Sequence, residues 1–172
     1  IEVYVDGSEI IIGVNTTGES LHKRNYRVYD HPAALKTTLA ASMLILSGWQ
    51  HEELLDPMCG GGTIVIEAAL MARKFPPGFF RRHLAFTKLT LYDPEVHRRE
   101  LEKALEEANR GSYQIYGFDV SPKHVRGAKL NASSAGVDDT VTFEVKDATR
   151  GETYRNLDVK HVVVNPPYGI RQ

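Results

Sequence analysis

The stretch Leu54-Leu55-Asp56-Pro57-Met58-Cys59-Gly60-Gly61-Gly62-Thr63-Ile64-Val65-Ile66-Glu67-Ala68-Ala69 decides the fold of this 172-residue chain. Two apolar residues ending in an acid, a glycine-rich turn and apolar residues at helical spacing predict a strand, a loop and a helix of an open α/β sheet. Glycines let a backbone approach a bound molecule and point N–H groups at it from the start of a helix. We therefore expect a ligand-binding loop, with Asp56 as an acceptor for an amine or cation.

The glycine spacing excludes two phosphate-binding motifs. If Gly60 and Gly62 are aligned on the first two glycines of the dinucleotide fingerprint, Val65 stands where the third glycine should be. The loop also lacks the Gly-Lys-Ser/Thr ending of a P-loop. On these residues alone, a purely structural turn stays an alternative.

A second informative stretch is Val162-Val163-Val164-Asn165-Pro166-Pro167-Tyr168-Gly169. A β-branched apolar run ending in Asn-Pro-Pro-Tyr predicts a buried strand followed by a rigid, extended turn. The carboxyl ends of parallel strands meet at one edge of a sheet. We therefore expect this turn and the glycine loop at the same edge.

Together, Asp-Pro-Met-Cys-Gly-Gly-Gly-Thr and Asn-Pro-Pro-Tyr-Gly resemble motifs of the S-adenosylmethionine-dependent RNA guanine-N2 methyltransferases that carry a THUMP domain ahead of a Rossmann-like catalytic domain. The likeness runs from Ser20-Leu21-His22-Lys23-Arg24 through Ser47-Gly48-Trp49 to Gly169. It implies a class I methyltransferase fold, S-adenosylmethionine as cofactor, and RNA as partner, with tRNA the leading substrate and 23S rRNA the alternative. Because the chain opens on Ile1 and not on Met, we expect it to begin inside a longer product, and the resemblance implies an RNA-binding THUMP domain ahead of it.

The resemblance implies catalytic roles for Asn165, Pro166, Pro167 and Tyr168. The Asn165 side-chain oxygen and the Pro166 carbonyl can accept the two hydrogens of a planar amine, and Tyr168 can stack on a flipped-out base. The same turn resembles that of adenine-N6 and glutamine-amide methyltransferases. It therefore indicates the class of nucleophile and not the substrate.

Cofactor-binding roles are expected for residues that follow the strands and form the glycine loop. These are Asp56, Pro57, Cys59, Gly60, Gly62, Thr63, Asp119, Val120, Asp147, Ala148 and Asn165. Asp119 is expected to accept from the ribose hydroxyls; the alternative, a helix N-cap, is less favoured because Ser121 can cap that helix. Asp147-Ala148 matches the family's usual site for the adenine amine. Gly61 departs from the expected Ser or Thr, and we assign no metal ligand.

Four strands are expected, at 54–56, 113–118, 140–145 and 160–164, in the order 3-2-1-4 of a seven-stranded sheet whose last three strands are absent. Residues 1–30 are assigned to an N-terminal hairpin and linker, and residues 31–172 to an incomplete Rossmann-like domain with a basic loop and helix inserted at 73–111. Helices are expected over 63–72, 95–109 and 122–136. Another is expected from Ala33 to Leu46, with Leu35, Leu39, Met43 and Leu46 as its apolar stripe.

Two basic segments are candidate RNA contacts. Lys23 and Arg24 precede two tyrosines, and Arg81 and Arg82 lie among phenylalanines in a stretch, 73–92, that contains no acid. The alternatives are a solvated connector for the first segment and a structural flap for the second.

Composition limits the remaining classes. The chain is 42% hydrophobic and 25% charged with a net charge of −1, which predicts a soluble domain that does not grip nucleic acid over its whole surface. One cysteine fits a reducing compartment, and we expect the cytoplasm. No apolar run is long enough to span a membrane. An RNA-binding module without catalysis, and a methyltransferase acting on a small molecule or a protein, stay alternatives.

Overall fold

The computed structural model describes residues 1–81 and 83–167. Its main sheet is parallel, with the strand order β5-β4-β3-β6. The two central strands are β3 (Leu54–Asp56) and β4 (Ile115–Asp119), and the two edge strands are β5 (Val141–Val145) and β6 (His161–Val162). In chain order this is 3-2-1-4, which confirms the predicted α/β sheet.

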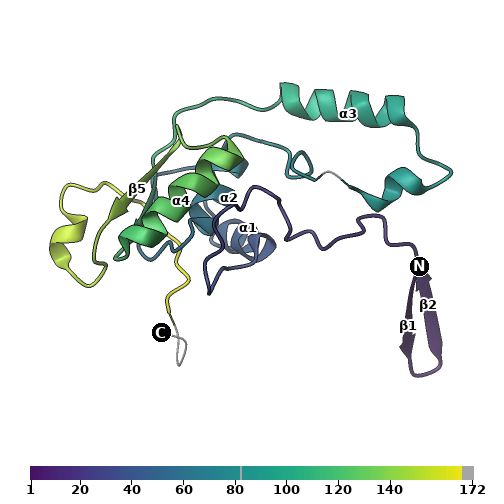
Figure 1. The fold of residues 1–172 in the computed structure, drawn as a ribbon, viewed down its shortest axis with the longest axis horizontal. Helices are drawn as coiled ribbons and strands as arrows, with labels where there is room; N and C mark the ends of the chain where they lie inside the picture. Colours follow the sequence, from purple (N-terminus) through teal and green to yellow (C-terminus); the bar gives the residue numbers. More distant parts are fainter. Residues whose placement is uncertain (82, 168–172) are drawn as a thin grey trace.

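Three helices form one layer against this sheet (Figure 1). Helix α2 (Thr63–Ala72) contacts both α1 (Thr37–Leu46) and α4 (Pro122–Ala135), and α2 and α4 pack on β4 and β5. Helix α2 is apolar nearly all round, so it is buried on every side. Its bounds are those predicted from the sequence.

Helix α1 begins four residues later than predicted, at Thr37 instead of Ala33. The predicted apolar stripe is also wrong, because Leu39 and Leu46 are 50% and 85% exposed and the buried face is formed by Thr37, Ala40 and Leu44. Apolar residues occupy most positions of this helix, so periodicity could not select the face that packs on α2.

Residues 24–36, which we call the strap, lie against the helix layer instead of extending into solvent. The Tyr26 hydroxyl donates to Glu67 at 2.9 Å, and Arg24 forms an ion pair with the same carboxylate at 3.3 Å. The pKa of Glu67 is raised by burial, which these two partners oppose. A carboxylate inside α2 is therefore neutralised by the strap.

Asn131 of α4 holds the strap and the glycine loop together. Its side-chain oxygen accepts from the backbone N–H groups of Val28 and Tyr29 at 2.8 and 2.7 Å. Its NH2 group donates to the carbonyls of Tyr29 and Gly61 at 3.0 and 2.9 Å. Gly127, one turn earlier, allows this approach, since a Cβ there would lie 2.1 Å from the Tyr29 ring.

The insertion at 73–111 leaves and rejoins the domain at one point. The Asn109 N–H donates to the Arg73 carbonyl, and its side chain donates to the Ala72 carbonyl. Between these ends lie a short 3₁₀ helix, η1 (Ala85–Lys88), and α3 (Pro94–Glu106). The helix predicted over 95–109 is present as α3, but none of its residues is buried, and α3 lies apart from the sheet and its helix layer (Figure 1).

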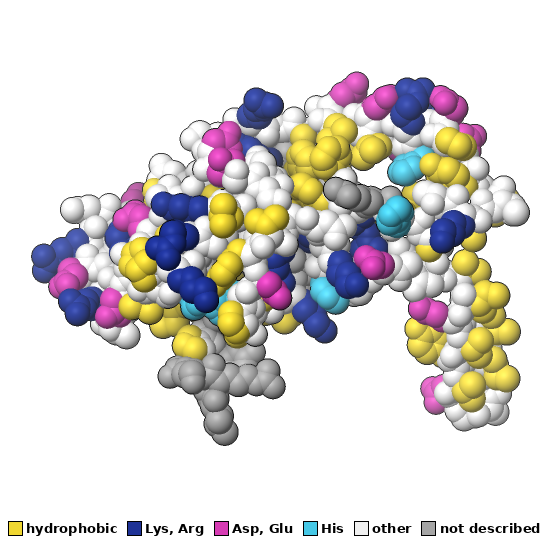
Figure 2. All heavy atoms as spheres, viewed as in Figure 1, with side chains coloured by type: hydrophobic (Ala, Val, Ile, Leu, Met, Phe, Trp, Pro, Cys, Tyr) yellow, Lys and Arg dark blue, Asp and Glu magenta, His cyan; other side chains and the backbone are white. Residues whose placement is uncertain are grey.

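The predicted N-terminal hairpin is confirmed. Strands β1 (Glu2–Asp6) and β2 (Glu9–Gly13) pair antiparallel, and Gly7 at the turn has a φ of 57°. Their apolar side chains are exposed on the projecting hairpin (Figure 2). Within the part of the chain that the structure describes, no helix is both long and apolar enough to cross a membrane.

We expect Asn131→Ala to lower the free energy of unfolding by about 3 kcal/mol, because four hydrogen bonds are lost and the carbonyl of the buried Gly61 loses this donor. Urea unfolding followed by circular dichroism measures this. Ser134→Ala, at an exposed position of the same helix, is the control. Equal stability of the two variants would show that Asn131 does not hold these segments together.

Candidate active site

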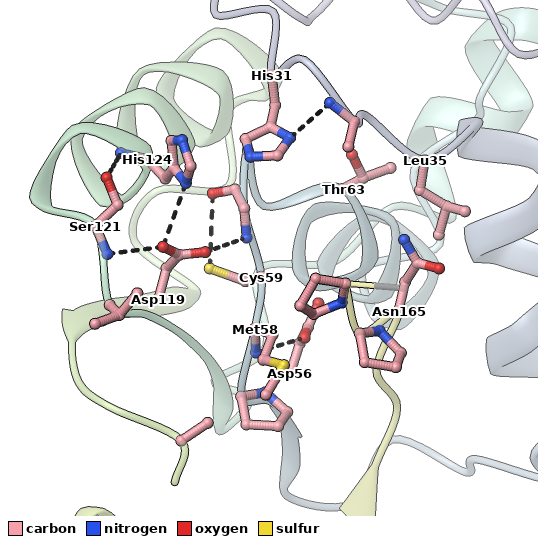
Figure 3. Close-up of a pocket in the computed structure, with 18 of the residues that line it drawn as sticks. His31, Leu35, Asp56, Met58, Cys59, Thr63, Asp119, Ser121, His124 and Asn165 are labelled. Carbon is pink, nitrogen blue, oxygen red and sulfur yellow. Dashed lines mark hydrogen bonds and ion pairs between the residues drawn. The ribbon is translucent and has the colours of Figure 1, made fainter. Parts of the chain in front are cut away.

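A cavity of about 890 Å³ opens at the carboxyl edge of the sheet (Figure 3). Its lining comes from the glycine loop, the end of β4, residues 147–149, residues 165–167, and residues 31–35 of the strap. Segments more than a hundred residues apart thus meet where open α/β sheets bind their ligands. The predicted meeting of the glycine loop and the Asn-Pro-Pro turn is confirmed.

The glycine loop turns tightly from β3 into α2. Gly60 and Gly62 have φ values of 52° and 82°, in the left-handed region that favours glycine. Gly60 and Gly61 line the cavity. Gly62 does not: a Cβ there would lie 2.9 Å from the Phe143 ring, so this glycine allows close packing of the helix start on β5. Of the glycines expected to bind the cofactor, Gly60 therefore lines the cavity and Gly62 does not.

Asp56 ends β3 at the base of the cavity and is 2% exposed. Its Oδ1 accepts from the Met58 N–H at 3.1 Å. Burial, together with the charge of Asp119, raises the pKa of Asp56 to about 7. Among the described residues, no cation pairs with this acid. It is therefore suited to accept from a cationic group of a ligand.

Asp119 ends β4 and faces the glycine loop. Its Oδ2 accepts from the Gly60 N–H at 3.0 Å, and its Oδ1 accepts from the Ser121 N–H at 2.8 Å. Ser121 caps α4 by accepting from the His124 N–H, as predicted. The Asp119 carboxylate is thus free of the capping role and keeps lone pairs for a ligand in the cavity.

Two histidines that sequence reasoning missed stand beside Asp119. His124 Nδ1 lies 3.3 Å from Asp119 Oδ1, and the His124 ring meets the His31 ring edge to face with centroids 4.2 Å apart. Both rings line the cavity (Figure 3). Neither belongs to a motif, and His31 is only the first residue of the predicted domain, directly after the linker, so no sequence signal placed them here.

The other predicted cofactor residues also line the cavity. These are Pro57, Cys59, Thr63, Val120, Asp147, Ala148 and Asn165. The Asp147 carboxylate accepts from the Thr149 N–H and hydroxyl at 2.9 and 2.7 Å, which fixes its orientation. Other lining residues, to which the sequence analysis gave no role in cofactor binding, include Met58, Ile64, Ser121 and Thr149.

The predicted catalytic turn lies across the cavity from Asp119. Asn165, Pro166 and Pro167 all line it, and Figure 3 shows Asn165 on the side of Leu35, away from His124. Tyr168 lies outside the described residues. The described part of the chain holds no group of three or more His, Cys, Asp or Glu side chains arranged for a metal ion.

The predicted RNA contacts differ in their surroundings. Lys23 is exposed and pairs with Glu19, whereas Arg24 turns inward to Glu67. The buried Arg81 guanidinium donates to the carbonyls of Thr17, Ser20 and Glu19. Arg24 and Arg81 therefore hold segments of this chain together, and Arg82 lies outside the described residues.

Asp56→Asn should change how stability depends on pH. The raised pKa means that the folded state favours the protonated acid, so the free energy of unfolding falls as pH rises from its ordinary pKa of 3.8 to about 7. Asn does not titrate, so the variant lacks this pH-dependent fall. Relative to the original chain, its free energy of unfolding should therefore rise by about 2 to 3 kcal/mol between pH 5 and pH 8. Urea unfolding at both pH values measures it. Asp138→Asn, at an exposed position, is the control; parallel pH profiles for Asp56→Asn and the original chain would contradict the assignment.

Comparison with known proteins agrees with this geometry. Residues 24–172 match the family model described as RMKL-like, methyltransferase domain. A Methanocaldococcus jannaschii protein named tRNA (guanine(6)-N2)-methyltransferase is 45% identical over 99% of this chain and 44% of its own length. An Aliivibrio salmonicida protein named Ribosomal RNA large subunit methyltransferase K/L is 40% identical over 99% of this chain and 25% of its own length.

A solved structure, the methyltransferase SMU.472 complexed with SAH, superposes with a TM-score of 0.80 at 34% identity. The match covers 91% of this chain and 41% of that one, so this chain spans less than half the length of each of the three proteins. By its sheet order, its site and the family model, the chain belongs to the RMKL-like methyltransferase domain family.

Proposed function

We propose that this chain is the catalytic part of an S-adenosylmethionine-dependent methyltransferase that acts on the exocyclic N2 amine of a guanine in tRNA. One observation carries the proposal: a single cavity joins a carboxylate suited to a ribose, Asp119, to an Asn-Pro-Pro turn suited to a planar amine. The methyl donor and the amine that receives the methyl group would therefore bind in the same cavity.

The residues of the cavity fit the cofactor group by group. Asp119 would accept from the ribose hydroxyls, and Asp147 would lie near the adenine amine. Gly60 and Gly61 line the cavity, and the absence of side chains there lets His31 of the strap pack against the loop. Asp56 would accept from the ammonium group, which favours its ionised form. When bound, the cofactor supplies an electrophilic methyl group on a sulfonium.

The chain's contribution to the reaction is alignment of the amine. The nitrogen lone pair of the guanine amine is delocalised into the ring, so the amine is a poor nucleophile. The Asn165 side-chain oxygen and the Pro166 carbonyl would accept its two hydrogens, favour the pyramidal geometry and stabilise the developing positive charge. Proline has no N–H to compete at this point. Tyr168 would stack on the base, and water would receive the proton.

The choice of RNA is supported by the relatives and not by the site. The archaeal relative is named for guanine 6 of tRNA, and the K/L relative for large-subunit rRNA, which is the alternative substrate. We propose that an RNA-binding THUMP domain in the longer protein selects the RNA, and that the protein acts in the cytoplasm. Lys23 and Arg82 would add contacts to RNA at this domain.

The methylated nucleoside tests the function directly. The longer protein that contains this chain is incubated with methyl-labelled S-adenosylmethionine and with tRNA or 23S rRNA, and the RNA is digested and analysed. We expect label in N2-methylguanosine of tRNA and none after nuclease pretreatment. Label only in rRNA would favour the alternative. Label at an adenine N6, or in a protein, would contradict the proposed nucleophile.

Two variants should separate binding from chemistry. Asn165→Ala should lower the methyl-transfer rate at least tenfold with unchanged affinity for S-adenosylhomocysteine, because it removes one acceptor for the amine. Asp119→Asn should instead weaken that affinity about tenfold, because the ribose loses a charged acceptor. Calorimetry and single-turnover rates measure both. A normal rate for Asn165→Ala would remove this residue from the mechanism.

A further inference from the structure

His31 has a defined tautomer. Its Nδ1 lies 3.1 Å from the Ala33 backbone N–H, which can only donate, so Nδ1 is an acceptor and carries no proton. The neutral ring must then carry its proton on Nε2. Burial and the neighbouring His124 lower the pKa of His31, against the opposing charges of Asp119 and Asp30, and the lowered pKa favours the neutral form.

The Nε2–H group has no protein acceptor among the hydrogen bonds of the described residues, and the ring lines the cavity. Nε2 lies over Gly60, 3.4 Å from the position that a Cβ would take there. Gly60 is the residue whose N–H binds Asp119 Oδ2. The donor of His31 and the acceptor of Asp119 therefore border the same part of the cavity (Figure 3).

A neighbouring donor and acceptor select the chemistry of the ligand atom between them. A carboxylate there would be repelled by Asp119, and an ammonium could not accept from His31. A hydroxyl satisfies both, since its hydrogen can go to the Asp119 carboxylate while its oxygen accepts from the imidazole N–H.

We propose that His31 is a cofactor-binding residue that donates its Nε2–H to the oxygen of a ribose hydroxyl whose hydrogen goes to Asp119. This inference rests on the proposed function, which places the ribose at Asp119. His124 is a positioning residue, since its contacts with Asp119 and with the His31 ring hold both groups in place. The strap thus supplies a direct contact to the cofactor.

Two substitutions of His31 separate its acceptor, Nδ1, from its donor, Nε2–H. In Asn, the side-chain oxygen lies as many bonds from Cβ as Nδ1 does, so His31→Asn keeps the acceptor for Ala33 and removes the donor. In Gln, the side-chain nitrogen matches Nε2, so His31→Gln keeps the donor and removes the acceptor. His83→Asn, at an exposed residue outside the cavity, is the control.

Calorimetry with S-adenosylhomocysteine should show about tenfold weaker binding for His31→Asn and near-original binding for His31→Gln and His83→Asn. With the 2′-deoxy and 3′-deoxy analogues, the defect of His31→Asn should disappear for the analogue that lacks the accepting hydroxyl. Weaker binding by His31→Gln alone would assign the ring a purely structural role and overturn the proposal. An equal defect with all three ligands would also overturn it.

Nitrogen-15 spectra of the original chain give a reading that needs no variant. They should show His31 protonated at Nε2, and this resonance should shift when S-adenosylhomocysteine binds. Binding without any shift of His31 would contradict the inference alone. If the original chain bound no S-adenosylhomocysteine, the proposed function itself would fail.

Discussion

The side-chain amide of Asn131 is the contact on which the site most depends. It uses both its oxygen and its nitrogen to join the strap and the glycine loop to α4. Each joined segment carries one wall of the cavity: His31 comes with the strap, Gly60 with the loop, and His124 with the helix. A shift of any of these segments would break hydrogen bonds between Asn131 and the backbone, so these bonds hold the three walls in place relative to one another.

Buried acids in this fold are of two kinds. Glu67 meets Arg24 and Tyr26, and so its charge is compensated by the protein itself. Asp56 accepts a backbone hydrogen bond from Met58 at the base of the cavity, and burial raises its pKa to about 7. The first acid serves packing, because its partners belong to the fold. The second is costly to the fold, and in the proposed function the ammonium group of the cofactor would be its partner.

Local sequence patterns predicted the parts of the structure that local physics determines. The bounds of α2, the cap at Ser121 and the order of the strands follow from turn residues, capping and apolar runs. The buried face of α1 and the position of His31 depend on which distant surface each segment meets. Arg81 shows the same limit, since only the fold reveals that its guanidinium holds carbonyls of the chain. The motifs therefore predicted where the cavity lies, but only the structure showed that the strap forms one of its walls.

The two ends of the insertion are joined by hydrogen bonds, so the inserted residues lie outside the part of the chain that forms the sheet and its helix layer. Residues 73–111 leave and return through the pair formed by Asn109 with Arg73 and Ala72, and α3 lies outside the core. The distance from α2 to β4 is thus set at that pair and not by the length of what lies between. Such a junction allows the inserted segment to differ in length or sequence without moving α2 relative to β4, so the cavity at the carboxyl edge of the sheet does not depend on the insertion.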